Sequence, residues 1–187
     1  MRVAVLALAV VVVLGSLCCA AQQGAMGWRI QSPYPNNPLK QATLAGTASH
    51  AGLTAKAEVQ LECRPDANGP RLNIVFTPKK VKFDADPFEG PGGLGERQKL
   101  RAMLAKEHWE HHFSGYYVDA DSFVLSLALE PAEARKIADE TSEGEILTVS
   151  VAPAKAGEVL RLVFHLPQGS DPVRAMLQPC LSVPHRQ

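Results

Sequence analysis

Two neighbouring segments of the chain carry an apolar residue at every second position. In residues 56–63 every second position is apolar, and residues 71–77 repeat this pattern. A period of two is that of a β-strand with one face in a core and the other in water. The connecting stretch contains Asn68-Gly69, a dipeptide typical of tight turns between antiparallel strands. The two segments therefore predict an antiparallel β-hairpin.

The second half of the chain repeats this arrangement, and Pro78 and Pro167 each end a predicted strand. Further strands are expected at residues 43–50, 122–129, 145–151 and 158–166, and short helices at residues 131–140 and 171–177. Hairpins of this kind predict a mainly β (α+β) fold. We expect an antiparallel sandwich or barrel-like sheet built from two strand–strand–hairpin halves, with one to three short helices.

The first residues resemble an export signal. Met1-Arg2 is followed by an unbroken apolar run over residues 3–14 and then by small residues up to Ala21. This pattern is typical of a cleavable secretory signal, and the run is too short to span a bilayer. We expect a signal peptide at residues 1–21, an extended N-terminal arm at residues 22–41, and a single β-rich domain at residues 42–187. An uncleaved anchor is an alternative.

Cysteine usage agrees with export to the periplasm or the medium. Only Cys63 and Cys180 remain after cleavage, and paired cysteines in an oxidising compartment usually bond. We therefore expect a Cys63–Cys180 disulfide, with two buried free thiols as the alternative. Lipidation of Cys18 or Cys19 is a weaker alternative to simple cleavage, because Leu17 precedes Cys18 where lipoprotein signals have a small residue.

The charge balance excludes some classes of partner. The chain has 19 basic and 19 acidic residues, and loss of Arg2 with the leader leaves a net charge of about −1. Such a chain has no electrostatic footprint for nucleic acid. The one basic group, Lys79, Lys80 and Lys82, fits a solvated hairpin end. Nothing after the leader approaches membrane-spanning length, so we expect peripheral membrane contact or none.

Three histidines form an unusual local cluster. Residues 96–112 predict a helix, because Leu100, Met103 and Leu104 share one helical face. On that helix His108 and His112 stand four apart with His111 beside them, a spacing that suits zinc or copper. The His-Glu-x-x-His order of metalloproteases is absent, and no further ligand is identifiable. The alternative is that these histidines form the polar end of an amphipathic helix.

The sequence contains no complete catalytic or nucleotide-binding motif. Gly90, Gly92 and Gly95 match the spacing of a dinucleotide-binding loop, but acidic residues precede them where that motif needs an apolar strand. We interpret this stretch as a loop. No Gly-x-Ser-x-Gly element is present. A carboxylate pair is a purely spatial feature, so an envelope hydrolase stays an alternative without nominated residues.

Aromatic residues gather around Ser114-Gly115. Trp109, Tyr116 and Tyr117 supply large, rigid side chains of the kind favoured at protein-binding surfaces. Together with Phe113, these rings alternatively cap the core where two elements meet.

One resemblance supports the binding hypothesis. Residues 59–63, a turn and residues 72–76 resemble the strand–Cys–hairpin opening of bacterial periplasmic C-type lysozyme inhibitors. Ser114-Gly115-Tyr116-Tyr117 is similar to their Ser-Gly-x-x-Tyr inhibitory loop, with the spacing off by one residue. The resemblance implies an inhibitor of a cell-wall hydrolase, but it covers only these short segments of a much longer chain and does not establish membership.

Taken together, these features predict an exported, non-catalytic protein that binds a protein partner in the cell envelope through surface loops, an inhibitor or immunity-type protein being one version. The first alternative is a periplasmic metal-binding protein using His108, His111 and His112. The second alternative is the envelope hydrolase.

Overall fold

The computed structural model describes residues 27–65, 69–90, 93–139, 145–168 and 171–181. The expected signal peptide, with Cys18 and Cys19, lies outside these residues. The expected arm is described from residue 27, and within it Arg29–Gln31 form a short strand, β1.

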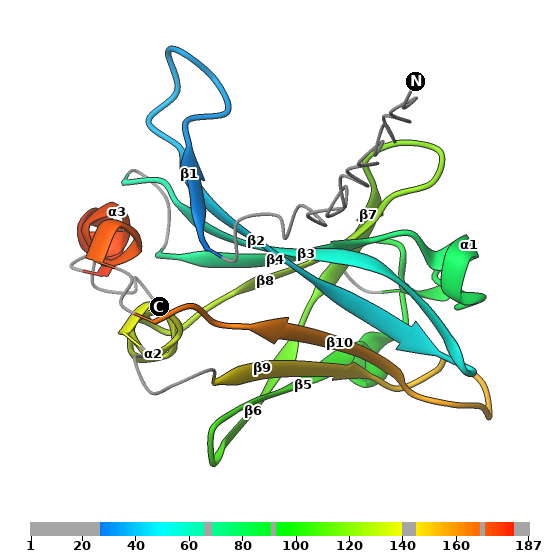
Figure 1. The fold of residues 1–187 in the computed structure, drawn as a ribbon. Coiled ribbons are helices and arrows are strands. Elements are labelled where there is room, and N and C mark those ends of the chain that lie inside the picture. Colours follow the sequence, from blue (N-terminus) through cyan, green and yellow to red (C-terminus); the bar gives the residue numbers. More distant parts are fainter. Residues whose placement is uncertain (1–26, 66–68, 91–92, 140–144, 169–170, 182–187) are drawn as a thin grey trace, which may run out of the picture.

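Ten strands of the described residues form one sheet in which all neighbouring strands are antiparallel (Figure 1). The order across the sheet is β6-β5-β9-β10-β2-β3-β4-β8-β7, with β1 added to β2. The remaining strands are β2 (Lys40–His50), β3 (Leu53–Cys63), β4 (Arg71–Phe76), β5 (Lys99–Leu104), β6 (Glu107–His112), β7 (Ser114–Tyr117), β8 (Phe123–Ala128), β9 (Ile146–Val151) and β10 (Leu160–His165).

The two ends of this sheet are consecutive in the chain. β6 and β7 are separated by Phe113 alone, yet β6 pairs with β5 and β7 pairs with β8. One bent segment therefore runs along both ends of the strand order and nearly closes the sheet. The predicted mainly β fold is confirmed, and of its two versions the barrel-like sheet is the one observed.

The core lies inside this barrel and follows from the period-two patterns. In β3 the alternate residues Val59, Leu61 and Cys63 are buried, and β10 buries Leu160, Leu162 and Phe164 in the same way. Burying a large aliphatic or aromatic side chain contributes roughly 1.5–3 kcal/mol. Strands with this pattern therefore give the sheet an inside and an outside.

Three helices close the ends of the barrel. α2 (Pro131–Asp139) and α3 (Asp171–Leu181) lie together at one end, and α1 (Pro78–Val81) lies at the other (Figure 1). The predicted helices at residues 131–140 and 171–177 are confirmed as α2 and α3. The basic group expected at a hairpin end lies instead on α1 and at Lys82, which follows it. In the described residues no helix is long and apolar enough to cross a bilayer.

A disulfide fastens α3 to the sheet. The sulfur atoms of Cys63, the last residue of β3, and Cys180 in α3 are 2.08 Å apart. This confirms the predicted pairing. It also explains how a helix more than a hundred residues further along the chain covers the end of β3.

The predicted helix over residues 96–112 is wrong. The residues from Lys99 onward form the β5–β6 hairpin, in which Leu100, Ala102 and Leu104 point into the core while Met103 is 40% exposed. Ala105 occupies the left-handed region at φ 54° in the turn. A short row of apolar residues fits the period of a helix and the period of a strand equally well. Pairing of β5 with β9 decides for the strand, because it buries one face of β5.

Candidate functional site

Tyr116 is the most exposed of the aromatic residues near the β6–β7 bend. It lies on β7 opposite Val124 of β8 and is 41% exposed on the outer face of the sheet. Partial burial raises the pKa of its hydroxyl, and the carboxylate of Glu62 acts in the same direction. An aromatic ring that is half covered and half open offers contact area at low entropic cost.

Tyr117 and Trp109 are engaged in the structure. The Tyr117 hydroxyl donates to the Asp86 carboxylate at 2.7 Å, and its ring packs edge-on against Phe123 with centroids 4.8 Å apart. Burial, and then the bond to Asp86, raise the pKa of Tyr117 to about 12. Trp109 packs against the core from β6. Of the three residues predicted to bind protein, Tyr116 is therefore the one presented outward, and among the described residues its ring makes no aromatic contact.

A rigid turn extends the surface beyond Tyr116. Val118 is 57% exposed at the start of the β7–β8 turn, residues 118–122, and its N–H donates to the carbonyl of Ser122 at 3.1 Å. The Asp119 carboxylate accepts from the N–H groups of Asp121 and Ser122, at 2.8 and 2.6 Å. These two bonds lower the pKa of Asp119. A turn closed in this way presents Val118 in one orientation.

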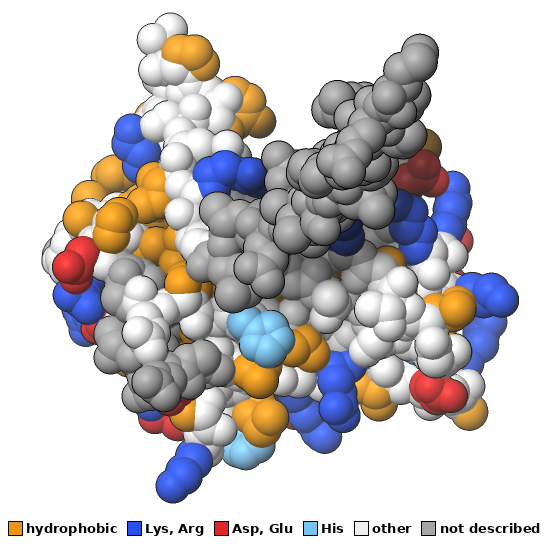
Figure 2. Space-filling model, in the orientation of Figure 1, with side chains coloured by type: hydrophobic (Ala, Val, Ile, Leu, Met, Phe, Trp, Pro, Cys, Tyr) orange, Lys and Arg blue, Asp and Glu red, His pale blue; other side chains and the backbone are white. Residues whose placement is uncertain are grey.

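A second exposed aromatic residue lies in the loop between β1 and β2. Residues 32–39 form a loop between β1 and β2 that projects from the barrel, and Figure 2 shows hydrophobic side chains at its tip. Tyr34 in this loop is 59% exposed. The N–H of Asn37 donates to the Tyr34 carbonyl at 3.2 Å, and the Asn37 side chain accepts from the N–H of Leu39 at 3.0 Å. Sequence reasoning missed Tyr34, although its Pro-Tyr-Pro setting marks a restricted turn.

The projecting loop leaves the barrel because two different strands pair with the same edge of β2, one along each half. β10 pairs with residues Thr47–Ser49, whereas β1 pairs with residues Gln41–Thr43. β3 occupies the whole of the other edge. The first half of β2 is therefore paired to a strand outside the barrel wall, which carries the loop away from the core.

A hydrogen-bonded polar network centred on the buried Gln41 lies between the two tyrosines. The Gln41 amide accepts from Gln31 at 2.8 Å and donates to Gln60 and Glu62, both at 3.0 Å. These side chains belong to β1, β2 and β3. Their polar groups are satisfied across three strands, so this part of the surface is held in one arrangement.

The network continues toward Tyr116 on β4 and β8, where Asn73 and Ser126 are buried at 4% exposure each. Arg71 donates to the Ser126 hydroxyl at 2.8 Å, and this hydroxyl donates to Asn73 at 2.6 Å. From β2 to β7 the surface crosses four strand spacings, or about 19 Å. We call the surface bounded by Tyr34, Tyr116 and Val118 the tyrosine face.

The three histidines do not share one face. On the strand β6, His108 and His112 point outward with Glu110, whereas His111 points the other way and lies 2.9 Å from the Glu133 carboxylate of α2. His112 lies 3.5 Å from Glu96. Among the described residues, no group of three or more His, Cys, Asp and Glu side chains is arranged to hold a metal ion. Zinc or copper binding stays a prediction, and its helical spacing argument no longer applies.

The glycine-rich stretch is a loop, as expected. Its described part leads into a short 3₁₀ turn (Gly95–Arg97), and the N–H of Gly90 donates to the Gly115 carbonyl at 2.7 Å. The loop therefore packs against β7 and supports the strand that presents Tyr116. It does not open a helix after a parallel strand, as a dinucleotide site requires.

Two exposed tyrosines, Tyr116 on β7 and Tyr34 in the β1–β2 loop, thus flank a hydrogen-bonded polar network. Comparisons of the chain with known protein families, with curated proteins and with solved structures found no match.

Proposed function

We propose that the protein is an exported, non-catalytic binding protein that holds a folded protein partner on the tyrosine face. The observation that supports this proposal is the pair of exposed rings, Tyr34 and Tyr116, on opposite sides of a hydrogen-bonded polar network whose central residues are buried. Aromatic anchors beside satisfied polar groups are the usual composition of a protein interface.

The dimensions and the stiffness of this face support a protein partner. A standard interface covers roughly 800 Å² of each protein, and the tyrosine face already spans about 19 Å between β2 and β7. Asn37 and Asp119 hold the two flanking turns. Elements that are ordered before binding lose little entropy on association.

Export is supported by the leader and by the disulfide. Residues 1–21 have the composition of a secretory signal, and Cys63–Cys180 suits an oxidising compartment. The partner is then a protein met outside the cytoplasm. A cell-wall hydrolase is the version that the resemblance of Ser114–Tyr117 to an inhibitory loop implies.

The test measures inhibition of a purified C-type lysozyme by the mature protein, using hydrolysis of peptidoglycan as the readout. The wild type is expected to inhibit, and Tyr116→Ala or Tyr34→Ala to weaken inhibition about thirtyfold, corresponding to about 2 kcal/mol for an aromatic anchor. Tyr117→Phe is the matched control, because Tyr117 is turned toward Asp86 and Phe123.

If lysozyme is not the target, the same variants are compared in capture from an envelope extract, with bound proteins quantified by mass spectrometry. A partner retained by wild type and Tyr117→Phe, and lost with both alanine variants, supports the tyrosine face. Equal capture by all four proteins contradicts it. Unchanged melting temperatures show that the alanine variants are folded.

A further inference from the structure

A second surface lies on the other side of the barrel, over β5, β9 and β10. It is a half-open groove of about 830 Å³. Its floor is formed by three small side chains: Thr148 and Ser150 of β9, and Ala152, which follows β9. The neighbouring strands β5 and β10 carry long side chains. A row of small residues between two rows of long ones makes a trough that runs along the strand.

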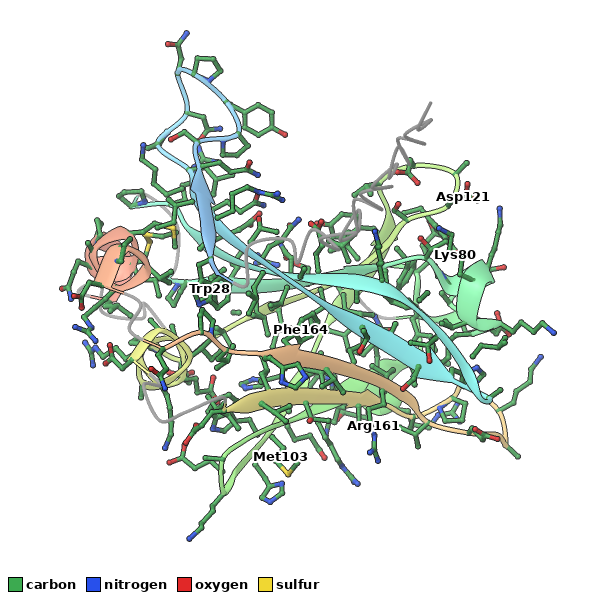
Figure 3. The ribbon with its side chains drawn as sticks, viewed as in Figure 1. Trp28, Lys80, Met103, Asp121, Arg161 and Phe164 are labelled. Carbon is green, nitrogen blue, oxygen red and sulfur yellow. A yellow bond between two sulfur atoms is a disulfide. The ribbon has the colours of Figure 1, made fainter. Side chains whose placement is uncertain are left out.

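Strand register places two arginines on opposite walls of this groove. Arg101 of β5 and Arg161 of β10 both pair with Ser150 of β9, one from each side. Their Cα atoms are therefore two strand spacings, or about 10 Å, apart. Met103 and Val159, which are 40% and 49% exposed, continue the walls. Figure 3 shows Arg161 and Met103 on the side of the sheet away from the core.

The groove carries an excess of positive charge. Four cationic side chains line it, Arg97, Lys99, Arg101 and Arg161, against two carboxylates, Glu96 and Glu110. Arg101 bonds to Glu110 at 3.1 Å, and Lys99 lies 3.7 Å from both carboxylates. No described carboxylate lies within ion-pair distance of Arg97 or Arg161. Arg97 and Arg161 are thus available to an anionic ligand, and Arg101, which bonds to Glu110 through Nε, keeps its terminal N–H groups for one.

The shape and lining select the kind of anion. Consecutive residues of an extended peptide point to opposite sides, so two adjacent acidic residues reach the two arginine walls at once. Arginine binds carboxylates through paired N–H groups, and the floor hydroxyls of Thr148 and Ser150 can bond to a peptide backbone. No Phe, Tyr or Trp lines the groove, so the groove lacks the large aromatic platform on which nucleic acid bases usually stack.

We infer that this groove binds an extended acidic peptide segment of a partner protein, with adjacent carboxylates between Arg101 and Arg161. The inference is independent of the tyrosine face. Arg161 pairs with Ser49, whereas β1 and the projecting loop begin at Gln41, about 27 Å along β2. In Figure 2, basic, histidine and hydrophobic side chains lie side by side in the lower half of the view, where Figure 1 shows β5, β9 and β10, away from the projecting loop.

The test uses a fluorescein-labelled synthetic peptide with four adjacent glutamates and a matched peptide with four glutamines, measured by fluorescence anisotropy on the mature protein. The wild type is expected to bind the glutamate peptide and not the glutamine peptide, and added salt is expected to weaken binding. Arg161→Ala should reduce the affinity about tenfold or more, because it removes a charge-assisted contact. Ser150→Leu should abolish binding by filling the floor without changing any charge.

Lys80→Ala is the matched control, because it removes one positive charge from α1, outside the groove. Its affinity should equal that of the wild type. Equal affinities for wild type, Arg161→Ala and Ser150→Leu overturn the inference, as does equal binding of the two peptides. Binding of a sulfated glycan such as heparin without binding of the glutamate peptide also overturns it. Arg161→Ala should leave lysozyme inhibition and partner capture unchanged, so the two proposals fail separately.

Discussion

Gln98 and Phe113 hydrogen-bond to each other twice at the bend that nearly closes the barrel. The N–H of Phe113 donates to the Gln98 main-chain carbonyl at 3.3 Å, and the Gln98 side-chain amide donates to the Phe113 carbonyl at 2.9 Å. The same amide donates to the carbonyl of Gly90 at 2.9 Å and accepts from the N–H of Leu94, also at 2.9 Å. One buried side chain thus holds the glycine-rich loop against the corner between β6 and β7.

Replacing Gln98 by alanine should destabilise the protein by about 3 kcal/mol, because a buried main-chain carbonyl at Phe113 and half-buried main-chain groups at Gly90 and Leu94 lose their partner. The free energy of unfolding in urea measures this. Gln168→Ala, at an exposed loop position, is expected to leave the free energy unchanged. A loss of less than about 1 kcal/mol for Gln98→Ala would mean that water replaces the amide.

Removing the disulfide should cost about 4 to 5 kcal/mol in the chain-entropy model, because Cys63 and Cys180 are separated by 117 positions. The measurement compares the unfolding free energy of the mature wild type with that of the Cys63→Ala/Cys180→Ala double variant. The double variant is preferred over single ones, which would leave an unpaired thiol. Two titratable thiols in the unfolded, non-reduced wild type would contradict the bond itself.

The Tyr117 hydroxyl should make stability fall at alkaline pH. Its pKa is raised from 10.0 to about 12 in the folded protein by burial and by the bond to Asp86. Between pH 10 and pH 12 the folded protein keeps this proton while the unfolded chain loses it. The unfolding free energy therefore decreases as the pH rises through this window, and the contribution is fully present below pH 10. Urea unfolding across this range should show a decrease in wild type that is smaller in Tyr117→Phe, which has no titrating hydroxyl.

A methyl group at Gly115 should disturb the support of the tyrosine face. A Cβ atom there would lie 2.3 Å from the Phe88 carbonyl oxygen and 2.5 Å from the Phe123 ring, and both atoms belong to buried residues. Overpacking of this kind costs roughly 1–3 kcal/mol. Gly157→Ala is the control, because its nearest neighbour would be at 3.7 Å. Equal melting temperatures for the two variants would show that the loop at Phe88 can shift.

Sequence reasoning succeeded where the pattern repeats within one segment. The alternation in residues 56–63 and 71–77 predicts the β3–β4 hairpin. The structure contains this hairpin, with the alternate apolar residues facing the core as expected. It failed at residues 96–112, where Leu100 and Leu104 fit a helical stripe and a strand equally well. The pairing of β5 with β9, more than forty residues later in the chain, decides between the two.

The amino-acid sequence by itself determined six of the strands (β2, β3, β4, β8, β9 and β10), the two longer helices and the Cys63–Cys180 pairing, because each rests on local periodicity or on the number of cysteines left to pair. Only the tertiary structure decided which side chains meet. Arg101, Ser150 and Arg161 form one row, and Tyr34 and Tyr116 flank one face, because strands distant in the chain are neighbours in the sheet. Such rows depend on strand order and register, which arise from packing of the whole core and leave no signal in any single segment.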